Sequence, residues 1–270
     1  MVSSVLRLPL LRLLERIAGL LRKLGLGGLV DRMRVGVLRG LGEFSERIGE
    51  VVLSGDVALH SHYVRQLKEA DREGATLRRF TEAVGPGTVV LDIGTHLGHF
   101  AALAAKRGAD VVAFEPNPRT LPYLRRNLEV NGVNERVRLV EQAVGARIGT
   151  ATFYMSPDGE QSSLHEPAGA DDAVTVRVTP VDQETRGLRV DVIKMDVEGA
   201  EVAALHGMKR TLEEASPDVV MFVERNPSAL TRAGHSPQEL DDALRALGLV
   251  FEELDEESEG DYVNLVCRRA

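Results

Sequence analysis

The chain has 270 residues, 43% of them hydrophobic, which is enough for one large catalytic domain with additional segments. Its formal net charge of -8 argues against a general nucleic-acid binder, because the phosphate backbone would repel it. The single cysteine, Cys267, excludes an internal disulfide framework, and no apolar run reaches about 18 residues, so we expect a cytoplasmic protein without a membrane span.

Residues 1–49 are expected to form a basic, amphipathic helical extension. Between residues 4 and 24, leucines recur at helical spacing with arginines between them, and the first 40 residues hold eight basic side chains against two acidic ones. Such a helix can lie on an anionic membrane surface, dock on a sister subunit or pack on its own domain. Peripheral membrane association and subunit contact through residues 4–24 therefore both stay open.

Residues 50–87 are expected to form a cap that precedes the core domain of residues 88–270. A hairpin signal covers residues 50–60 around Ser54, Gly55 and Asp56. Helical patterns follow at residues 62–70 and 75–84, and a Gly-Pro-Gly sequence ends the second pattern.

Residues 89–115 have the order of a nucleotide-cofactor half-site in an open parallel sheet. Residues 89–91 predict a strand buried on both faces, Gly94 and Gly98 bracket a tight turn before a helix, and residues 111–114 predict a second buried strand, which ends at Glu115. A dinucleotide fingerprint also requires glycines at the third and sixth positions of the turn, and these positions hold His96 and His99.

Asp92 and Glu115 indicate a different ligand. Asp92 can attract an amino group into the turn, and Glu115 can accept two hydrogen bonds from a ribose diol. Each of these charge-assisted contacts is worth on the order of 1.5–3 kcal/mol. A ligand with a ribose and a free amino-acid end but no phosphate suits both groups, and S-adenosylmethionine is such a ligand.

Residues 117–181 predict a helix, a strand and an inserted hairpin. Asn117 is expected to cap the helix, with Pro118 at its first position, and it can also touch the cofactor. The strand at residues 136–140 leads to Gln142, whose amide can reach the edge of an adenine ring. Strand alternation then predicts a hairpin within residues 149–181 in place of a crossover helix, and its polar loop carries His165, a candidate for proton abstraction.

Asp196 and Glu198 follow the fourth core strand, predicted at residues 190–195, where the sheet order is expected to reverse. Two interpretations stay open. Asp196 and Glu198 can position the methionine amino group and an acceptor hydroxyl, or they can hold a divalent cation that lowers the pKa of that hydroxyl. No further Asp or Asn cluster with octahedral potential is evident, so no resident metal is expected.

The remaining residues bring the number of expected core strands to seven and complete an α/β pattern. A helix is expected at residues 200–215. A buried strand at residues 219–223 ends at Glu224, a candidate substrate-facing carboxylate. A helix through residue 247 and strands at residues 249–254 and 262–268 follow.

Four segments resemble the FkbM-type family of S-adenosylmethionine-dependent methyltransferases: LDIGTHLGHF, AFEPNP, YLRRNLEVNGV and, most specifically, IKMDVEGAE. The chain departs from the family at Thr95-His96, where the family usually has Ala-Asn. The resemblance implies that the seven strands form an α/β, Rossmann-like methyltransferase sheet, mostly parallel, with a C-terminal antiparallel hairpin. It also implies O-methylation of a hydroxyl on a small-molecule or glycan acceptor, such as a sugar, a lipid-linked saccharide or a polyketide.

Together, the residues and the resemblance predict the following site. The catalytic candidates are Asp196, Glu198 and His165. A nicotinamide-dependent oxidoreductase, disfavoured by His96 and His99, and a non-catalytic module that keeps the cofactor fold for partner binding are the alternatives. The candidates for binding S-adenosylmethionine are Asp92, Gly94, Thr95, Gly98, Glu115, Asn117, Gln142 and Asp196.

Overall fold

The structure, a computed structural model, describes residues 42–68, 74–156, 162–166, 170, 172–254 and 262–270. The amphipathic helix expected at residues 4–24 lies outside these ranges, so the helix and its membrane or subunit contact stay predictions. Within the described ranges, no helix combines the length and the apolar character that crossing a bilayer requires.

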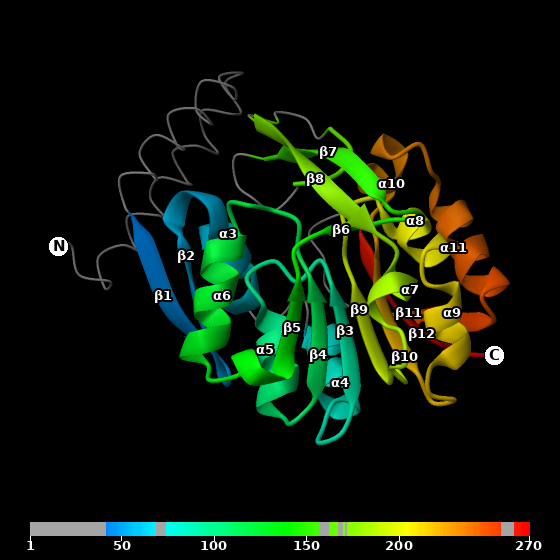
Figure 1. Cartoon of the computed structure of the whole chain (residues 1–270), viewed down its shortest axis with the longest axis horizontal. Helices are drawn as coiled ribbons and strands as arrows, with labels where there is room; N and C mark the ends of the chain where they lie inside the picture. Colours follow the sequence, from blue (N-terminus) through cyan, green and yellow to red (C-terminus); the bar gives the residue numbers. More distant parts are fainter. Residues whose placement is uncertain (1–41, 69–73, 157–161, 167–169, 171, 255–261) are drawn as a thin grey trace.

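A seven-stranded sheet forms the centre of the molecule, in the order β11-β12-β10-β9-β3-β4-β5 (Figure 1). The first five of its strands in chain order are parallel, whereas β12 runs antiparallel to both β10 and β11. The predicted fold class is therefore confirmed. The strands are β3 (Val89–Ile93), β4 (Asp110–Phe114), β5 (Val137–Val140), β9 (Val192–Met195), β10 (Val220–Arg225), β11 (Leu249–Glu253) and β12 (Val263–Arg269).

Helices cover both faces of this sheet, which explains why its central strands are continuously apolar. Successive residues of a strand belong to hydrophobic clusters on opposite faces of the sheet. In β3, Val90 belongs to the first cluster and Leu91 to the second; in β10, Phe222 belongs to the first and Val223 to the second. The first cluster also contains residues of α4 (Gly74–Ala83), α5 (His99–Lys106) and α6 (Leu121–Val130). The second contains residues of α7 (Val181–Glu184), α8 (Glu201–His206), α9 (Lys209–Glu214), α10 (Pro227–Arg232) and α11 (Pro237–Ala246).

The strand order reverses at β3, which lies between β4 on one side and β9 on the other. From β3 the chain builds outward through β4 and β5, and then returns to add β9 and β10 on the opposite side. Ligands of open α/β sheets bind at such a reversal, at the carboxyl ends of the strands.

The N-terminal hairpin differs from its prediction. It consists of β1 (Glu43–Ile48) and β2 (Val51–Asp56), so the turn expected near Ser54 lies within a strand, and the expected boundary at residue 49 falls inside the hairpin. The glycine and aspartate have other roles. A Cβ on Gly55 would lie 2.8 Å from the Phe44 ring, and the Asp56 carboxylate accepts hydrogen bonds from the first amides of α3 (Val57–Lys68).

Within residues 149–181, where a hairpin was expected, two antiparallel strands belong to a small separate sheet. This sheet has the order β6-β8-β7 and lies beyond the carboxyl ends of the central strands (Figure 1). Ser163, in the connection between its long strands, pairs with Tyr154 through two backbone hydrogen bonds. The strands are β6 (Ala143–Val144), β7 (Gly149–Met155) and β8 (Asp172–Thr179).

Two helices differ from their predicted bounds. Asn117 does not cap α6, which begins at residue 121; its side chain accepts a hydrogen bond from the Arg119 amide and closes a turn before the helix. The helix expected at residues 200–215 is split at Gly207, where a Cβ would lie 2.2 Å from the Gly145 carbonyl oxygen. The short helix α10, capped by Asn226, was not predicted.

Candidate active site

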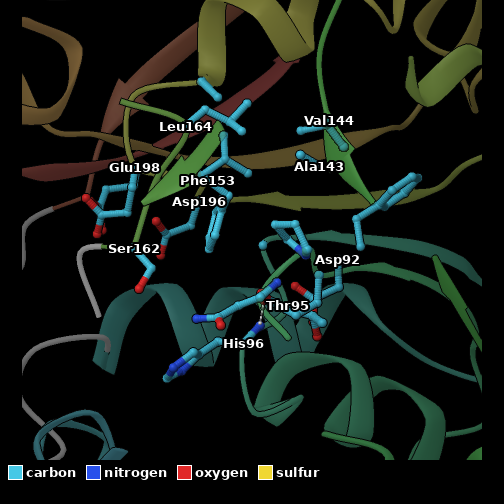
Figure 2. Close-up of a pocket in the computed structure, with 18 of the residues that line it drawn as sticks. Asp92, Thr95, His96, Ala143, Val144, Phe153, Ser162, Leu164, Asp196 and Glu198 are labelled. Carbon is cyan, nitrogen blue, oxygen red and sulfur yellow. Dashed lines mark hydrogen bonds between the residues drawn. The ribbon is translucent and has the colours of Figure 1, made fainter. Parts of the chain in front are cut away.

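A cavity of about 420 Å³ lies at the carboxyl ends of β3, β4, β9 and β10. A cavity of this size is typical of small-molecule sites. Figure 2 shows Asp92 and Thr95 at one side of it and Glu198 and Ser162 at the other. The lining includes most of the predicted site: Asp92, Gly94, Thr95, Glu115, Asn117, Gln142, Asp196 and Glu198.

The turn after β3 is fixed by hydrogen bonds to the end of β4. The amides of Gly94 and Thr95 both donate to the Phe114 carbonyl oxygen at 3.0 Å, and the Thr95 hydroxyl donates to Asp92 Oδ2 at 2.5 Å. Burial raises the pKa of Asp92 to about 6, although the hydrogen bond from Thr95 opposes the shift. Asp92 is therefore a buried carboxylate that a cationic ligand group would stabilise in its ionised form.

Gly94 and Gly98 both have left-handed backbones, with φ of +86° and +84°. A Cβ on Gly94 would lie 1.8 Å from the Asp196 carbonyl oxygen, so this glycine allows the ends of β3 and β9 to approach closely. A Cβ on Gly98 would lie 2.6 Å from Leu124 Cδ1, and Gly98 is not among the residues that line the cavity. Gly98 thus serves the packing of α6, and direct cofactor contact by it is not supported.

Glu115 joins the glycine turn to the end of β4. Its carboxylate accepts hydrogen bonds from the amides of His96 (2.9 Å) and Asn117 (2.8 Å). Burial raises the pKa of Glu115 to about 7, and these two hydrogen bonds oppose the shift. Each carboxylate oxygen has a second lone pair, so Glu115 can hold the turn and still accept a donor from a ligand in the cavity.

His96 is a lining residue that the sequence did not assign to the site. Its backbone is left-handed, with φ of +51°, and its ring packs edge-on against Tyr63 of α3, with the centroids 4.4 Å apart. Its Nε2 atom is buried without a hydrogen-bond partner among the described residues. Burial lowers the pKa of His96 to about 4, so a neutral imidazole edge is available to a ligand.

Three carboxylates gather at the ends of β9 and β10. One oxygen each of Asp196, Glu198 and Glu224 lies within 4.8 Å of the others. Lys194 Nζ lies 3.4 Å from Asp196 Oδ2, and Arg232 lies 3.6 Å from Glu198 Oε2. The sequence had grouped only Asp196 and Glu198 because Glu224 follows a different strand, so the divalent-cation interpretation gains a third oxygen ligand.

Lys194 and Arg232 are cavity residues that the sequence reasoning missed. Lys194 lies within β9, its side chain is only 4% exposed, and its ammonium group lies 5.4 Å from the centroid of the Phe100 ring. The available signal was a single lysine in an otherwise apolar, doubly buried strand, where a charge requires a partner. Arg232 is brought to the cavity by α10, the helix that was not predicted.

Glu201 shapes the loop between β9 and α8. Its Oε1 accepts hydrogen bonds from the amides of Val197 (3.1 Å) and Gly199 (3.2 Å), and Glu201 is not among the residues that line the cavity. Burial raises its pKa to about 7. Within the loop it supports, Glu198 has a left-handed backbone with φ of +52°. Non-glycine residues seldom adopt this conformation, and it is common at functional sites.

His165 does not lie where proton abstraction would require it. The inserted hairpin contributes Phe153, Ser162 and Leu164 to the lining, but not His165. The Ser163 hydroxyl donates to the Glu198 carbonyl oxygen at 2.7 Å and accepts from the His165 amide at 3.1 Å. The insert is thereby attached to the acidic loop. Burial and the neighbouring His235 and Arg232 lower the pKa of His165.

The open sheet, its reversal at β3 and the acidic cavity at that reversal define a Rossmann-like protein of the methyltransferase type. A sequence model of this type matches residues 92–251, more than half of the chain, and is described as the methyltransferase FkbM domain. The chain belongs to the FkbM methyltransferase family.

Two curated relatives and one solved structure are similar to the chain. The 2-O-methyltransferase NoeI of Sinorhizobium fredii is 34% identical over 148 residues, which cover 47% of this chain and 60% of NoeI. The hexuronic acid methyltransferase AglP of Haloferax volcanii is 25% identical over 154 residues, which cover 56% of this chain and 62% of AglP. The chain thus spans about three fifths of the length of either relative.

The structural similarity concerns the fold alone. A crystal structure of a proposed rRNA methylase from Clostridium thermocellum superposes with a TM-score of 0.51 at 11% identity, and it covers 73% of this chain and 95% of the methylase. At this identity the methylase shares the architecture but indicates nothing about the acceptor.

Proposed function

We propose that the protein is an S-adenosylmethionine-dependent O-methyltransferase whose acceptor is a hydroxyl of a sugar or glycan. The observation that carries this proposal is the placement of Asp92, Glu115 and Asp196, which come from three adjacent strands and line one cavity. Family membership supports the methyl transfer, and the printed activities of NoeI and AglP favour a sugar hydroxyl as the acceptor.

The chemistry of the lining fits the cofactor. Among the described residues that line the cavity, five are carboxylates, and Lys194 and Arg232 are the cations. A sulfonium and an ammonium group would find compensating charge there, whereas a pyrophosphate would be repelled. The carboxylates are Asp92, Glu115, Asp196, Glu198 and Glu224.

In this proposal, one group of lining residues binds the cofactor and another contacts the acceptor. Glu115 would bind the ribose hydroxyls and Gln142 the adenine edge, while Asp92 and Asp196 would hold the amino-acid end. Bound S-adenosylmethionine supplies a methyl group that is already activated by the sulfonium, so the chain has to align the acceptor and accept its proton. Ser162, Leu164 and Arg232, from the inserted hairpin and α10, line the same cavity and would contact the acceptor.

A methyl-transfer assay tests this proposal. The full chain is incubated with S-adenosylmethionine and the methyl glycosides of a neutral hexose, a hexuronic acid and an amino sugar, and mass spectrometry measures methylated product and S-adenosylhomocysteine. We expect stoichiometric formation of both with at least one glycoside. Binding of NADH in place of S-adenosylmethionine would contradict the proposal and favour an oxidoreductase.

A further inference from the structure

One carboxylate of the acidic group differs from the other two in its contacts. Asp196 has Lys194 at 3.4 Å and Glu198 has Arg232 at 3.6 Å, so each faces a cation. The Glu224 carboxylate instead accepts a hydrogen bond from the neutral Asn226 amide group at 3.3 Å. A neutral donor compensates a carboxylate charge less than a cation does, so Glu224 has the least compensated negative charge of this group.

The charges around Glu224 agree with this difference. Burial raises the pKa of Glu224 well above its ordinary value, and the negative charges of Asp196, Glu198 and Glu201 add to the shift, while Lys194 opposes it in part. A general base works best when its pKa is near the operating pH, and a glutamate reaches that range by burial and by neighbouring negative charge.

The fold separates Glu224 from Asp92 and Glu115, the two cavity carboxylates at the ends of β3 and β4. Val223 pairs with Met195, so Glu224 and Asp196 occupy equivalent positions at the ends of two neighbouring strands. The cofactor carboxylates Asp92 and Glu115 belong to β3 and β4, on the other side of β9. Glu224 lines the same cavity and is close in sequence to α10, which contributes Ser228 and Arg232 to the lining.

We propose that Glu224 is the general base that accepts the proton of the acceptor hydroxyl; this inference rests on the proposed function. In the transfer, the hydroxyl oxygen forms a bond to the methyl carbon while its proton moves to a Glu224 carboxylate oxygen. The carbon–sulfur bond breaks, and its electron pair stays on sulfur to give the neutral thioether. The proton then leaves Glu224 for solvent. Asp196 and Glu198, neutralised by their cations, position the two reactants.

The test compares Glu224→Gln with Glu224→Asp and with the control Glu252→Gln. Glu252 is an exposed carboxylate on the edge strand β11, where it pairs with Arg79. The amide of Glu224→Gln preserves the size of the side chain and an oxygen for the Asn226 contact, but cannot accept the proton. Thermal unfolding and calorimetry with S-adenosylmethionine verify that each variant folds and binds the cofactor.

At saturating cofactor we expect Glu224→Gln to lower kcat about 10²- to 10⁴-fold with the cofactor Kd within about twofold of wild type. The rise of wild-type kcat with increasing pH should disappear in Glu224→Gln, whereas Glu224→Asp should retain part of the activity. A Glu224→Gln variant with wild-type kcat and the same pH profile would overturn the inference. Methyl transfer by the wild-type protein would still support the proposed function in that case.

A second measurement does not need the acceptor. In protein labelled with carboxyl-¹³C glutamate and saturated with S-adenosylhomocysteine, we expect one carboxyl resonance that titrates above the ordinary glutamate pKa and is absent from the Glu224→Gln spectrum. If the resonance lost in Glu224→Gln titrates at the ordinary value, Glu224 is not the base. Failure of the wild-type protein to bind the thioether would instead refute the proposed function.

Discussion

Glu115 accepts hydrogen bonds from two backbone amides and also lines the cavity. Its removal should therefore weaken ligand binding and loosen the glycine turn. We predict that Glu115→Ala raises the Kd of S-adenosylmethionine roughly 10- to 150-fold, the equivalent of one charge-assisted contact. Isothermal titration calorimetry measures this. The control is Glu129→Ala, an exposed carboxylate in the last turn of α6, which should leave the Kd unchanged. Equal affinities of the two variants would refute the ribose assignment.

The raised pKa values of Asp92 (about 6) and Glu115 (about 7) predict opposite pH dependences for binding and stability. A carboxyl group with a raised folded-state pKa stabilises the fold below its unfolded pKa, and this stability is lost as the pH rises through the folded value. The ligand-free protein should therefore lose stability between about pH 4 and 7 as these groups ionise. Affinity for the cationic cofactor should increase over the same range.

Denaturant unfolding and calorimetry between pH 5 and 8 test both trends. Glu115→Gln, which cannot ionise, should flatten the pH dependence of cofactor binding. Affinity that stays constant with pH in the wild-type protein would show that neither carboxylate needs to be ionised for binding.

At the residue scale, the sequence predicted those site residues whose position follows from the pattern. Asp92, Glu115 and Asp196 lie at or just beyond the ends of recognisable buried strands, and all three line the cavity. His96 and Lys194 could not be assigned in this way. Their roles depend on burial, on a left-handed backbone and on partners from other elements, which local sequence does not specify.

At the element scale, the end of β3 depends on a glycine that allows a close backbone approach. Gly94→Ala would place a Cβ against the Asp196 carbonyl oxygen and force a strained φ, so we predict a loss of roughly 2–4 kcal/mol in the free energy of unfolding. Gly149→Ala is the matched control, because a Cβ there meets nothing within 4 Å. Urea unfolding should leave the control near wild type; equal losses for both variants would contradict the structure of the turn.

The inserted hairpin is attached to the acidic loop through the Ser163 hydroxyl. Ser163→Ala should raise the acceptor KM roughly 2- to 10-fold, the equivalent of one ordinary hydrogen bond, and leave the cofactor Kd unchanged. Steady-state kinetics measures the effect, with the glycoside that the wild-type protein accepts as the substrate. The control is Thr150→Ala, at an exposed position of β7. A change in cofactor affinity without a change in acceptor KM would show that the inserted hairpin affects the cofactor and not the acceptor, contrary to this prediction.

The elements themselves were predictable where burial is continuous. The central strands β3 and β4 are mostly apolar runs, and the inserted hairpin shows alternation of apolar and polar residues. The predictions of local structure were wrong where the same residue type is common in more than one kind of local structure. Gly55 and Asp56 resemble a turn but serve ring packing and helix capping, and Asn117 closes a turn that precedes its helix.

At the scale of the whole molecule, two groups of charged residues line the cavity, and both come from strands of the same sheet. Asp92 and Glu115 lie at the ends of β3 and β4. Asp196, Glu198 and Glu224 lie at the ends of β9 and β10, and the close contact between Gly94 and Asp196 joins the two groups. This arrangement follows from the strand order, which periodicity alone does not specify and which the family resemblance supplied.

A chelator separates the two interpretations of the acidic group. If Lys194 and Arg232 neutralise Asp196 and Glu198, methyl transfer should be unchanged in excess EDTA, and added Mg²⁺ should not stimulate it. Loss of activity in EDTA that Mg²⁺ restores would show that Asp196, Glu198 and Glu224 bind a divalent cation instead.

The most direct measurement is calorimetric titration of the full wild-type chain with S-adenosylmethionine, S-adenosylhomocysteine and NADH. The placement of Asp92, Glu115 and Asp196 predicts saturable one-to-one binding of the first two ligands and none of NADH. Absence of heat with both adenosyl ligands, at protein concentrations that would detect a Kd of about 1 mM, would contradict the assignment of the cavity.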